Sequence, residues 1–427
     1  MKKELKRAII YQIFVRNYTK EGNLQGVISH LEEIEKSGAT ILYLMPIFPI
    51  GLEGRKGSVG SPYAIQDYMS IDPSQGSEKD LSLLCQKAHE RKLSVILDMV
   101  FNHTSRDSLL SKEHPEYFYH NKEGKFANKI GDWDDVIDLD HSQPELEEYL
   151  LQVLEKYISL GVDGFRFDVA SLIPASFFVQ ARERIGKDKI LLAECIDSSF
   201  VLWARDLGFH SLSNQELISS GFDLLYSYAS FHYMRLFLES KNPIYLEQYK
   251  AAYEVEMATI SEEALIARGL ENHDKKRLAS YSKEESFTRS LLLFDLLCYG
   301  PSFVYAGMEY KASHLPALFE KDVISHEIVD ASYYEYYLKL ISLKKRDLTL
   351  SQRTSLLLES PLSTLLMKNT YDEKEEYALC NFSGKEVTFS LKNGTYIDLL
   401  SDERFIIKNG SFRTKEPRYL SLEAIDN

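Results

Sequence analysis

Carboxylate, arginine and histidine side chains recur in this sequence directly after short apolar or β-forming runs. The clearest cases are four segments: DMVFNH from Asp98, GFRFD from Gly164, LLAE ending at Glu194 and ENHD from Glu271. A (β/α)₈ barrel carries its catalytic groups at such strand ends, on the carboxyl-terminal face. Three of these acids, Asp168, Glu194 and Asp274, are enough for the acid–base and nucleophilic chemistry that cleaves a glycosidic bond.

The segment GFRFD has the alternation of a strand. Neighbouring side chains on a strand point to opposite faces, so Arg166 and Asp168 share one face. An interior arginine favours the ionised form of a neighbouring carboxyl group, which suits a nucleophile. Taken alone, the pair could also be a structural ion pair near the mouth of a barrel. We expect Asp168 to be the nucleophile.

Glu194 and Asp274 supply the other two acids. A carboxyl group that leaves an apolar strand near other acids is desolvated and favoured in its protonated form, so we expect Glu194 to be the general acid. Alone, Glu194 could be a helix-capping or solvated acid, and the pair His273–Asp274 could be structural. A retaining glycosidase needs a nucleophile about 5 to 5.5 Å from its acid/base group, and neutral histidines such as His103 and His273 can donate to sugar hydroxyls.

The elements that must position these residues alternate between strand and helix. Apolar or β-branched runs predict eight strands, at about 8–15, 40–46, 94–100, 163–167, 189–193, 222–226, 265–270 and 302–306. Helical periods lie between them, with capping-box spacing at Ser77–Asp80 and Ser142–Glu145. The pattern predicts an α/β fold, a (β/α)₈ TIM barrel.

Two stretches depart from this alternation. Residues 104–141 show no sustained period, which is typical of a functional insertion or small subdomain. From about residue 350, short β-type runs separated by turns predict an antiparallel β domain, and Asn-Gly pairs at Asn393 and Asn409 predict hairpins. We therefore expect a barrel over 1–103 and 142–349, a short domain B over 104–141, and a C-terminal β-sandwich domain C over 350–427.

Bulk composition narrows the class of partner. The net charge of −14 and pI near 5.4 argue against nucleic acid and anionic membranes, while a neutral sugar is compatible. The first residues, MKKELKRAIIYQIFV, lack a signal-peptide cleavage site and are interpreted as the first strand. Four scattered cysteines have neither metal nor disulfide spacing. We expect a cytoplasmic protein with no membrane partner and no organic cofactor.

The four segments resemble the four sequence regions of the α-amylase family, glycoside hydrolase family 13, in the same order along the chain. The motifs match at Asp98, Asn102, His103, Arg166, Asp168, Glu194, His273 and Asp274. Asp138-Leu139-Asp140 resembles an additional region of the family, and Tyr63 falls where the family places a tyrosine that stacks on the sugar. The resemblance spans essentially the whole chain.

The resemblance implies roles for these residues. Asp168 would be the nucleophile, Glu194 the acid/base and Asp274 the transition-state stabiliser. Arg166 would orient Asp168, while the side chains of Tyr63, His103 and His273 would hold the sugar. The reaction would be retaining cleavage of α-glucosidic bonds, mainly α-1,4, in maltooligosaccharides or short α-glucans through a covalent glucosyl-enzyme.

One departure bears on metal binding. Many polymer-degrading members carry Lys-His shortly after the nucleophile, where it supports a sugar subsite and a calcium site, but this chain has Ser171-Leu172. Asn102 and Asp140 match two side-chain calcium ligands of the family, whereas calcium takes six or more oxygens. Two alternatives follow: calcium bound through Asn102 and Asp140, or an Asn102 that only ties domain B to the barrel.

Two other hypotheses for the function are compatible with the sequence. A transglycosylase or isomerase of the same family would use the same three acids, because water and a sugar hydroxyl compete for one intermediate. A non-catalytic barrel that only binds would typically have lost triad carboxylates, and this chain has all three.

Overall fold

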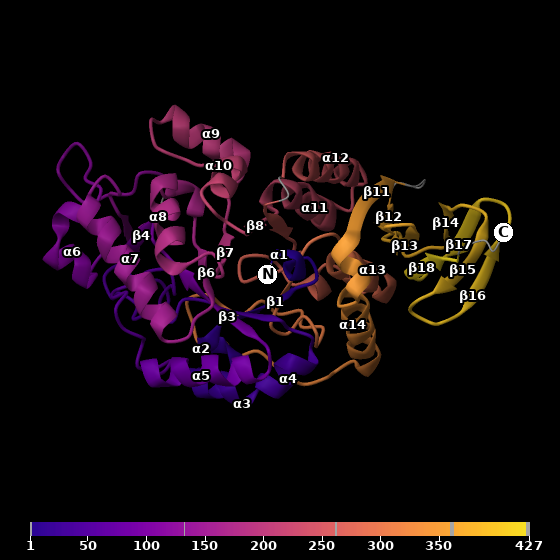
Figure 1. The fold of residues 1–427 in the computed structure, drawn as a ribbon, viewed down its shortest axis with the longest axis horizontal. Helices are drawn as coiled ribbons and strands as arrows, with labels where there is room; N and C mark the ends of the chain where they lie inside the picture. The colour runs from indigo at the N-terminus through magenta and orange to yellow at the C-terminus, as the bar shows by residue number, and fades with distance from the viewer. Residues whose placement is uncertain (1, 132, 261–262, 359–362, 424–427) are drawn as a thin grey trace.

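The larger part of the chain forms a closed barrel of eight parallel strands (Figure 1). The computed structural model describes residues 2–131, 133–260, 263–358 and 363–423. The barrel strands are β1 (Ile9–Ile13), β2 (Ile41–Leu44), β3 (Ser94–Met99), β6 (Gly164–Phe167), β7 (Ile190–Ala193), β8 (Leu224–Tyr226), β9 (Leu265–Ala267) and β10 (Ser302–Tyr305). Their order is β10-β1-β2-β3-β6-β7-β8-β9, and a parallel bridge between Arg268 and Ser302 joins the two ends. The predicted (β/α)₈ fold is confirmed.

The strand register aligns the polar residues of three neighbouring strands. Asp98 on β3 pairs with Arg166 on β6, so their side chains enter the barrel at one level. Phe167 on β6 pairs with Ala193 on β7. Asp168 and Glu194, the next residue of each strand, therefore leave the barrel side by side at its carboxyl-terminal end.

Helices cover the outside of the barrel. They are α1 (Lys2–Leu5), α2 (Val15–Tyr18), α3 (Leu24–Ser29), α4 (Leu31–Lys36), α5 (Glu78–Glu90), α7 (Pro144–Ser159), α8 (Ala175–Ile185), α9 (Ser198–Asp206), α10 (Asn214–Ser219), α11 (Tyr228–Ser240), α12 (Ile244–Thr259), α13 (Glu285–Leu297) and α14 (Ala331–Lys344), with 3₁₀ turns at Ala170–Leu172, Leu278–Ser280 and Asp347–Ser351.

The two predicted capping boxes have different outcomes. At α5, the Ser77 side chain accepts from the Asp80 N–H and the Asp80 side chain accepts from the Ser77 N–H, as predicted. At α7 the prediction was wrong, because the helix begins at Pro144 after Gln143. The Ser142 N–H instead donates to Asp140 Oδ1 at 3.0 Å, in a turn of its own.

The segment between β3 and α7 stands out from the barrel as an irregular insertion. Its regular elements are β4 (His103–Ser105), α6 (Leu109–Glu113), a 3₁₀ turn (Pro115–Tyr117) and β5 (Val136–Asp138). Strands β4 and β5 form an antiparallel pair that joins His103 to Asp138. The ends of the insertion thus meet above the barrel strand that supplies Asp98. The domain boundaries at 104, 142 and 350 stay a prediction.

The C-terminal part is an antiparallel β structure. It comprises β11 (Gln352–Leu358), β12 (Thr364–Tyr371), β13 (Lys374–Asn381), β14 (Val387–Ser390), β15 (Gly394–Asp398), β16 (Arg404–Ile407), β17 (Ser411–Thr414) and β18 (Arg418–Leu422). Six strands form one sheet, in the order β11-β12-β13-β18-β15-β16, and β14 pairs with β17 in a second. A small apolar core, including Leu379, Phe389 and Tyr396, draws residues from both sheets.

The two predicted Asn-Gly hairpins were wrong. Strand β14 before Asn393 pairs with β17, and β15 after it pairs with β16 and β18. The same holds at Asn409, because β16 and β17 belong to different sheets. Both turns carry the chain from one sheet to the other, and they contact each other through a 2.8 Å bond from the Gly410 N–H to Asn393 Oδ1.

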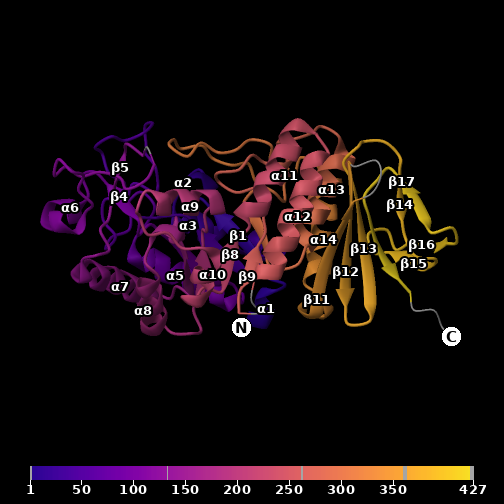
Figure 2. The same cartoon turned by 90° about the horizontal axis from the view of Figure 1, so that it is seen from above.

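The barrel and the six-stranded sheet meet at α13 and α14 (Figure 2). Ser290 on α13 bonds to the backbone of Asn381 on β13, donating to its carbonyl at 3.1 Å and accepting from its N–H at 3.0 Å. Leu356, Met367 and Cys380 of the sheet belong to the same buried apolar cluster as the barrel residues. The six-stranded sheet and the barrel therefore share one apolar core.

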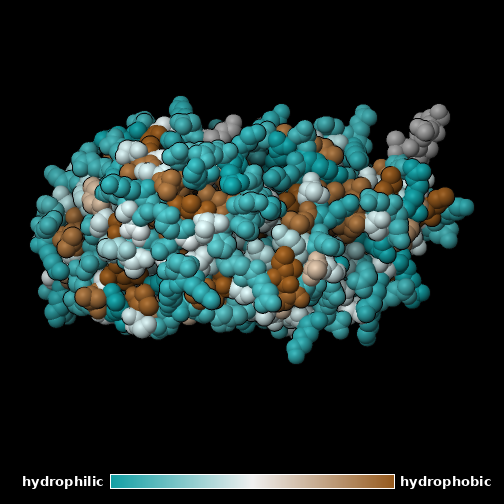
Figure 3. All heavy atoms as spheres, turned by 90° about the horizontal axis from the view of Figure 1, so that it is seen from below, coloured by the Kyte–Doolittle hydropathy of each residue, from teal (hydrophilic) through white to brown (hydrophobic). Residues whose placement is uncertain are grey.

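The exterior is mostly hydrophilic, and the apolar side chains on the face in Figure 3 are scattered in small groups. Acidic residues outnumber basic ones by 64 to 50 in the whole sequence. None of the helices in the described parts of the chain is long and apolar enough to cross a bilayer.

Candidate active site

A cavity of about 320 Å³ opens at the carboxyl-terminal end of the barrel strands. It is lined by Lys56, Ser61, Tyr63, His103, Trp133, Asp135, Val136, Asp168, Val169, Glu194, His273, Asp274, Leu318 and Phe319. All three predicted acids are in this set, together with three of the four predicted sugar-binding residues. The fourth, Arg166, has no exposed surface and contacts two of the acids.

The Arg166 guanidinium contacts three carboxyl groups at the centre of the site. Its Nη1 donates to Asp98 Oδ1 at 2.7 Å and to Asp168 Oδ1 at 2.9 Å, while its Nη2 lies 2.8 Å from Glu194 Oε2. Three buried carboxyl groups thus contact one cation. This arrangement follows from the strand register, because Asp98, Arg166 and the following residues of β6 and β7 lie at successive levels of the barrel.

The charges around Arg166 disfavour ionisation of all three carboxyl groups at once. Burial raises the pKa of Asp168 well above its usual value; Arg166 opposes this, while the nearby Glu194 and Asp98 reinforce it. Burial also raises the pKa of Asp98, against the attraction of Arg166. Three carboxylates around one guanidinium would carry two uncompensated charges, so a proton is favoured within the cluster. A retaining glycosidase needs one protonated and one ionised carboxyl group.

Glu194 has two further partners that fix its side chain. The Val169 N–H donates to Oε2 at 2.9 Å, and the Tyr228 hydroxyl donates to Oε1 at 3.0 Å. Val169 adopts φ of 42°, in the left-handed region that β-branched residues avoid. Such strain is concentrated at functional sites, and here it aims a backbone donor at the carboxyl group.

Asp274 lies at the exposed side of the cavity, with 47% of its side chain accessible. His273 Nε2 is 3.0 Å from its Oδ2. Desolvation within the pocket acts to raise the pKa of Asp274, but the nearby charge and hydrogen bond of His273 outweigh this effect and lower it to about 2. Asp274 is therefore ionised at neutral pH and can face developing positive charge.

Tyr63 and His273 form a stacked pair over the centre of the barrel. Their ring centroids are 5.4 Å apart with an interplanar angle of 23°, and the Tyr63 hydroxyl is 2.6 Å from His273 Nε2. Gln12 Nε2 lies 2.8 Å from the other ring nitrogen, and Tyr63 also donates to Asp98 Oδ2 at 3.2 Å. Both rings are thereby held in place before any sugar binds.

His103 lies on the other side of the nucleophile candidate. Its Nε2 is 3.9 Å from Asp168 Oδ2, and its ring contacts Trp133 with a centroid distance of 5.6 Å. Burial lowers the pKa of His103 to about 4, so the ring is neutral at neutral pH. A neutral ring can donate to a sugar hydroxyl without adding charge to the site.

Neither of the two calcium ligands implied by the resemblance, Asn102 and Asp140, lines the active-site cavity. Asp140 Oδ1 accepts from the Ser142 N–H, outside the cavity. Asn102 is buried and its Oδ1 has no hydrogen-bond partner among the described residues, as is also true of Asp138 Oδ1. Within those residues there is no cluster of three His, Cys, Asp or Glu side chains that could hold a metal. None of the chemistry considered for this site runs through a metal ion.

Several lining residues were not predicted. Trp133 and Asp135 come from the insertion, and Lys56 and Phe319 come from loops. Tyr228, at the start of α11, does not line the cavity but contacts Glu194 and was not predicted either. Lys56 Nζ contacts Asp135 Oδ1 at 2.7 Å, bridging a barrel loop to the insertion. Trp133 is one of only two tryptophans in the sequence and lies in a stretch without helical period, which is a signal that could have identified it.

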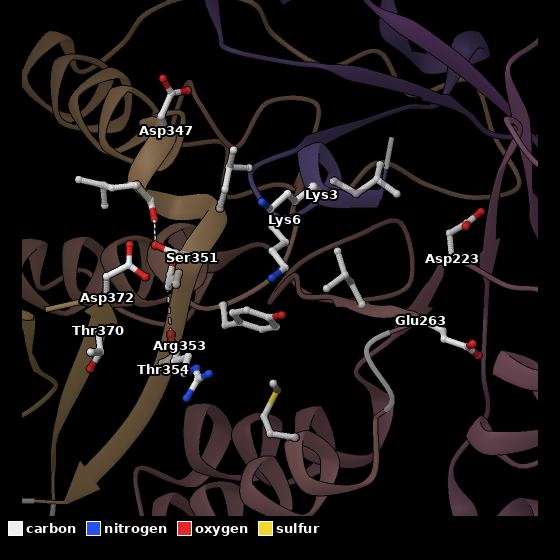
Figure 4. Close-up of a pocket in the computed structure, with 17 residues that line it drawn as sticks. Lys3, Lys6, Asp223, Glu263, Asp347, Ser351, Arg353, Thr354, Thr370 and Asp372 are labelled. Carbon is white, nitrogen blue, oxygen red and sulfur yellow. Dashed lines mark hydrogen bonds between the residues drawn. The ribbon is translucent and has the colours of Figure 1, made fainter. Parts of the chain in front are cut away.

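A larger cavity, of about 1080 Å³, lies at the opposite end of the barrel (Figure 4). Its lining residues include Lys3 of α1, Lys6 just after that helix, Arg353 of β11 and Leu265, the first residue of β9. Active sites of this fold lie at the carboxyl-terminal ends of the strands, so the smaller cavity is the candidate active site.

A parallel eight-stranded barrel with a nucleophile candidate, an acid/base candidate and a third carboxylate at its strand ends has the architecture of a barrel glycosidase. The family model for the α-amylase catalytic domain matches residues 12–190. A crystal structure of an α-amylase from Lactobacillus plantarum is 33% identical, with a TM-score of 0.91, and the match covers 99% of this chain and 100% of that one. The chain belongs to the α-amylase family, glycoside hydrolase family 13.

Two curated relatives extend the comparison. Alpha-amylase 3 of Dictyoglomus thermophilum is 33% identical over 196 residues, which is 39% of this chain, and a cyclomaltodextrinase of a Bacillus species is 26% identical over 350 residues, which is 76%. The chain spans 37% and 59% of the lengths of these two relatives.

Proposed function

We propose that this protein is a retaining glycoside hydrolase that cleaves α-glucosidic bonds, mainly α-1,4, in maltooligosaccharides or short α-glucans. The observation that carries the proposal is the shared guanidinium, since Asp168 and Glu194 contact Arg166 at 2.9 and 2.8 Å. This arrangement keeps two carboxyl groups close, as the separation of about 5 to 5.5 Å in retaining enzymes requires.

In the first step, Glu194 donates its proton to the glycosidic oxygen while Asp168 attacks the anomeric carbon. Asp168 Oδ1 is held by Arg166, whereas Oδ2 faces His103 at 3.9 Å and is the oxygen available for attack. The bond from the anomeric carbon to the leaving sugar breaks as the bond to Asp168 forms. Glu194 is then a carboxylate, and the glucosyl unit is covalently bound to the enzyme.

In the second step, Glu194 takes a proton from water, and the water oxygen attacks the anomeric carbon. The bond to Asp168 breaks, and glucose or a shorter oligosaccharide is released with its original anomeric configuration. The hydrogen bonds from Val169 and Tyr228 keep the Glu194 carboxyl group in place for both transfers.

Asp274 and the histidines act on the sugar ring. The low pKa of Asp274, about 2, keeps it ionised beside the oxocarbenium-like transition state. His103, His273 and Tyr63 line the same cavity and can contact ring hydroxyls. The cavity of about 320 Å³ is at the small end of ligand pockets, which favours short substrates.

The test is a product time course on maltotriose with the wild-type protein and two variants. Asp168→Asn and Glu194→Gln should each lower kcat by about 10³-fold or more, whereas Asp188→Asn, at a carboxylate 78% exposed, should leave it unchanged. Comparable kcat in either active-site variant would sink the catalytic assignment, and an inactive wild type would favour the non-catalytic barrel. Longer oligomers as main products would favour the transglycosylase, and an isomeric sugar the isomerase.

We propose the cytoplasm as the compartment. The four cysteines are free and buried, which suits a reducing environment.

A further inference from the structure

The side chain of Lys129 lies near Asp140, one of the two calcium ligands that the family resemblance implies, and both residues line one cavity. We propose that the Lys129 ammonium takes the role of the calcium ion, tying the insertion to the barrel, so that this protein folds and acts without calcium. The inference goes beyond the proposed function and does not rest on it, because its first readout is stability.

Lys129 is bonded to the segment that closes the insertion. Its Nζ donates to the Leu139 carbonyl at 2.9 Å, and its backbone N–H donates to Asp138 Oδ2 at 2.7 Å. Leu139 in turn donates its N–H to the carbonyl of Asn102 at 2.9 Å. A chain of hydrogen bonds therefore runs from Lys129, within the insertion, to Asn102, just after barrel strand β3.

The charges around Lys129 are those that a bound cation would need. Asp138 and Asp140, on either side of Leu139, both attract the ammonium. Asp138 is fully buried, and an unpaired buried carboxylate is costly, so a neighbouring positive charge stabilises it. Lys129 supplies that charge from within the chain.

The oxygens left over are too few for calcium. The Leu139 carbonyl and Asp138 Oδ2 accept from Lys129, and Asp140 Oδ1 accepts from the Ser142 N–H. Among the buried side-chain oxygens of this cluster, Asn102 Oδ1 and Asp138 Oδ1 have no partner in the described part of the chain, whereas calcium takes six to eight oxygens. A divalent ion placed beside them would also be repelled by the ammonium.

The neighbouring cavity agrees with this assignment. It measures about 290 Å³ and is lined by Lys129 and Asp140 together with the apolar side chains of Leu172, Pro174 and Phe209. Leu172 is the residue that stands where many polymer-degrading members have histidine.

The experiment compares metal content and thermal unfolding of the whole protein. Wild-type protein dialysed against EGTA should contain no stoichiometric calcium, and its Tm and its activity on maltotriose should be the same with EGTA or with millimolar Ca²⁺. Lys129→Met keeps the length of the side chain but removes its charge and donor, and should lower Tm by about 5 °C. Lys129→Arg keeps the charge and should therefore lower Tm less.

Lys125→Met is the matched control. Lys125 lies in the same insertion, but its side chain is 76% exposed and its Nζ lies 3.5 Å from Glu123 Oε2, so loss of its charge should not change Tm. About one calcium per wild-type chain, or a Tm that falls in EGTA, would overturn the proposal. A Tm of Lys129→Met equal to that of Lys125→Met would overturn it as well. If Lys129→Met does not fold, the calcium content and EGTA response of the wild type decide the question.

Discussion

Arg166 shows how much of the site depends on one side chain. Asp98, Asp168 and Glu194 all contact its guanidinium, and none of them could stay buried and ionised without it. The side chain is fully buried, so its contacts with these carboxyl groups lie below the surface of the cavity. A side chain inside the barrel therefore positions these carboxyl groups, and loops contribute the remaining contacts of the site.

At the residue scale, Tyr228 is expected to position the acid/base group. Tyr228→Phe removes the hydroxyl that donates to Glu194 Oε1 at 3.0 Å, and should lower kcat on maltotriose about tenfold, since a hydrogen bond to a carboxyl group is worth about 1.5 to 3 kcal/mol. On an aryl α-glucoside whose leaving group needs no proton, the loss should be smaller. Steady-state kinetics on both substrates measure the difference.

Tyr226→Phe is the matched control for Tyr228→Phe. Tyr226 packs edge-on against Tyr228 at 5.3 Å, but its hydroxyl makes no hydrogen bond to Glu194 or to another described residue. Its kcat on maltotriose should be close to that of the wild type. Equal losses on the two substrates in Tyr228→Phe would argue for a general packing effect instead of a role in proton transfer.

At the scale of elements, the insertion forms one wall of the active-site cavity. Trp133, Asp135 and Val136 come from it, and the Lys56–Asp135 ion pair connects it to a barrel loop. The barrel strands supply the reacting groups, whereas the insertion supplies an aromatic surface above them. We therefore expect the barrel strands to carry out the reaction and the insertion to contribute to sugar binding.

Trp133→Ala tests this division. Loss of the indole should raise KM for maltotriose about tenfold and change kcat much less, because an aromatic face binds the sugar in the ground state and the transition state alike. Trp203→Ala is the control, since Trp203 lies on α9 outside the cavity and is 46% exposed. A fall in kcat at unchanged KM would place Trp133 in the chemical step and contradict the division.

At the scale of the whole molecule, the C-terminal sheet and the barrel share one apolar core. Phe382, at the end of β13, packs against Phe287 of α13 at 5.5 Å and Phe237 of α11 at 5.4 Å. Gln352 and Asn369 of the sheet both donate to the Leu297 carbonyl at the end of α13. We therefore expect the two parts to unfold together.

Phe382→Ala should lower the free energy of unfolding by about 3 to 5 kcal/mol and leave a single transition, because the cavity it creates lies within the shared core. Phe412→Ala, at an outer and only partly buried position, should cost less. Denaturant unfolding followed by tryptophan fluorescence and by far-UV circular dichroism measures both variants. Two separated transitions in the wild type would contradict the shared core.

The sequence by itself determined the barrel, its strand ends and the cluster of acids. Most residues of the barrel strands are apolar, and Asp168 and Glu194 directly follow β6 and β7, so local pattern is enough to locate these two acids. The Asn-Gly pairs at 393 and 409 were misjudged for the opposite reason. A turn residue specifies that the chain bends, but pairing is decided by strands that are distant in the sequence.

Only the tertiary structure decided what surrounds those acids. The meeting of three carboxyl groups at Arg166, the hydroxyl of Tyr228 on Glu194 and the ammonium of Lys129 beside Leu139 join residues up to 68 positions apart. Their energies depend on burial and on distances of a few ångströms, and neither quantity is encoded by residue type or spacing. Sequence pattern therefore located the proposed reacting groups, and packing determined which residues contact them.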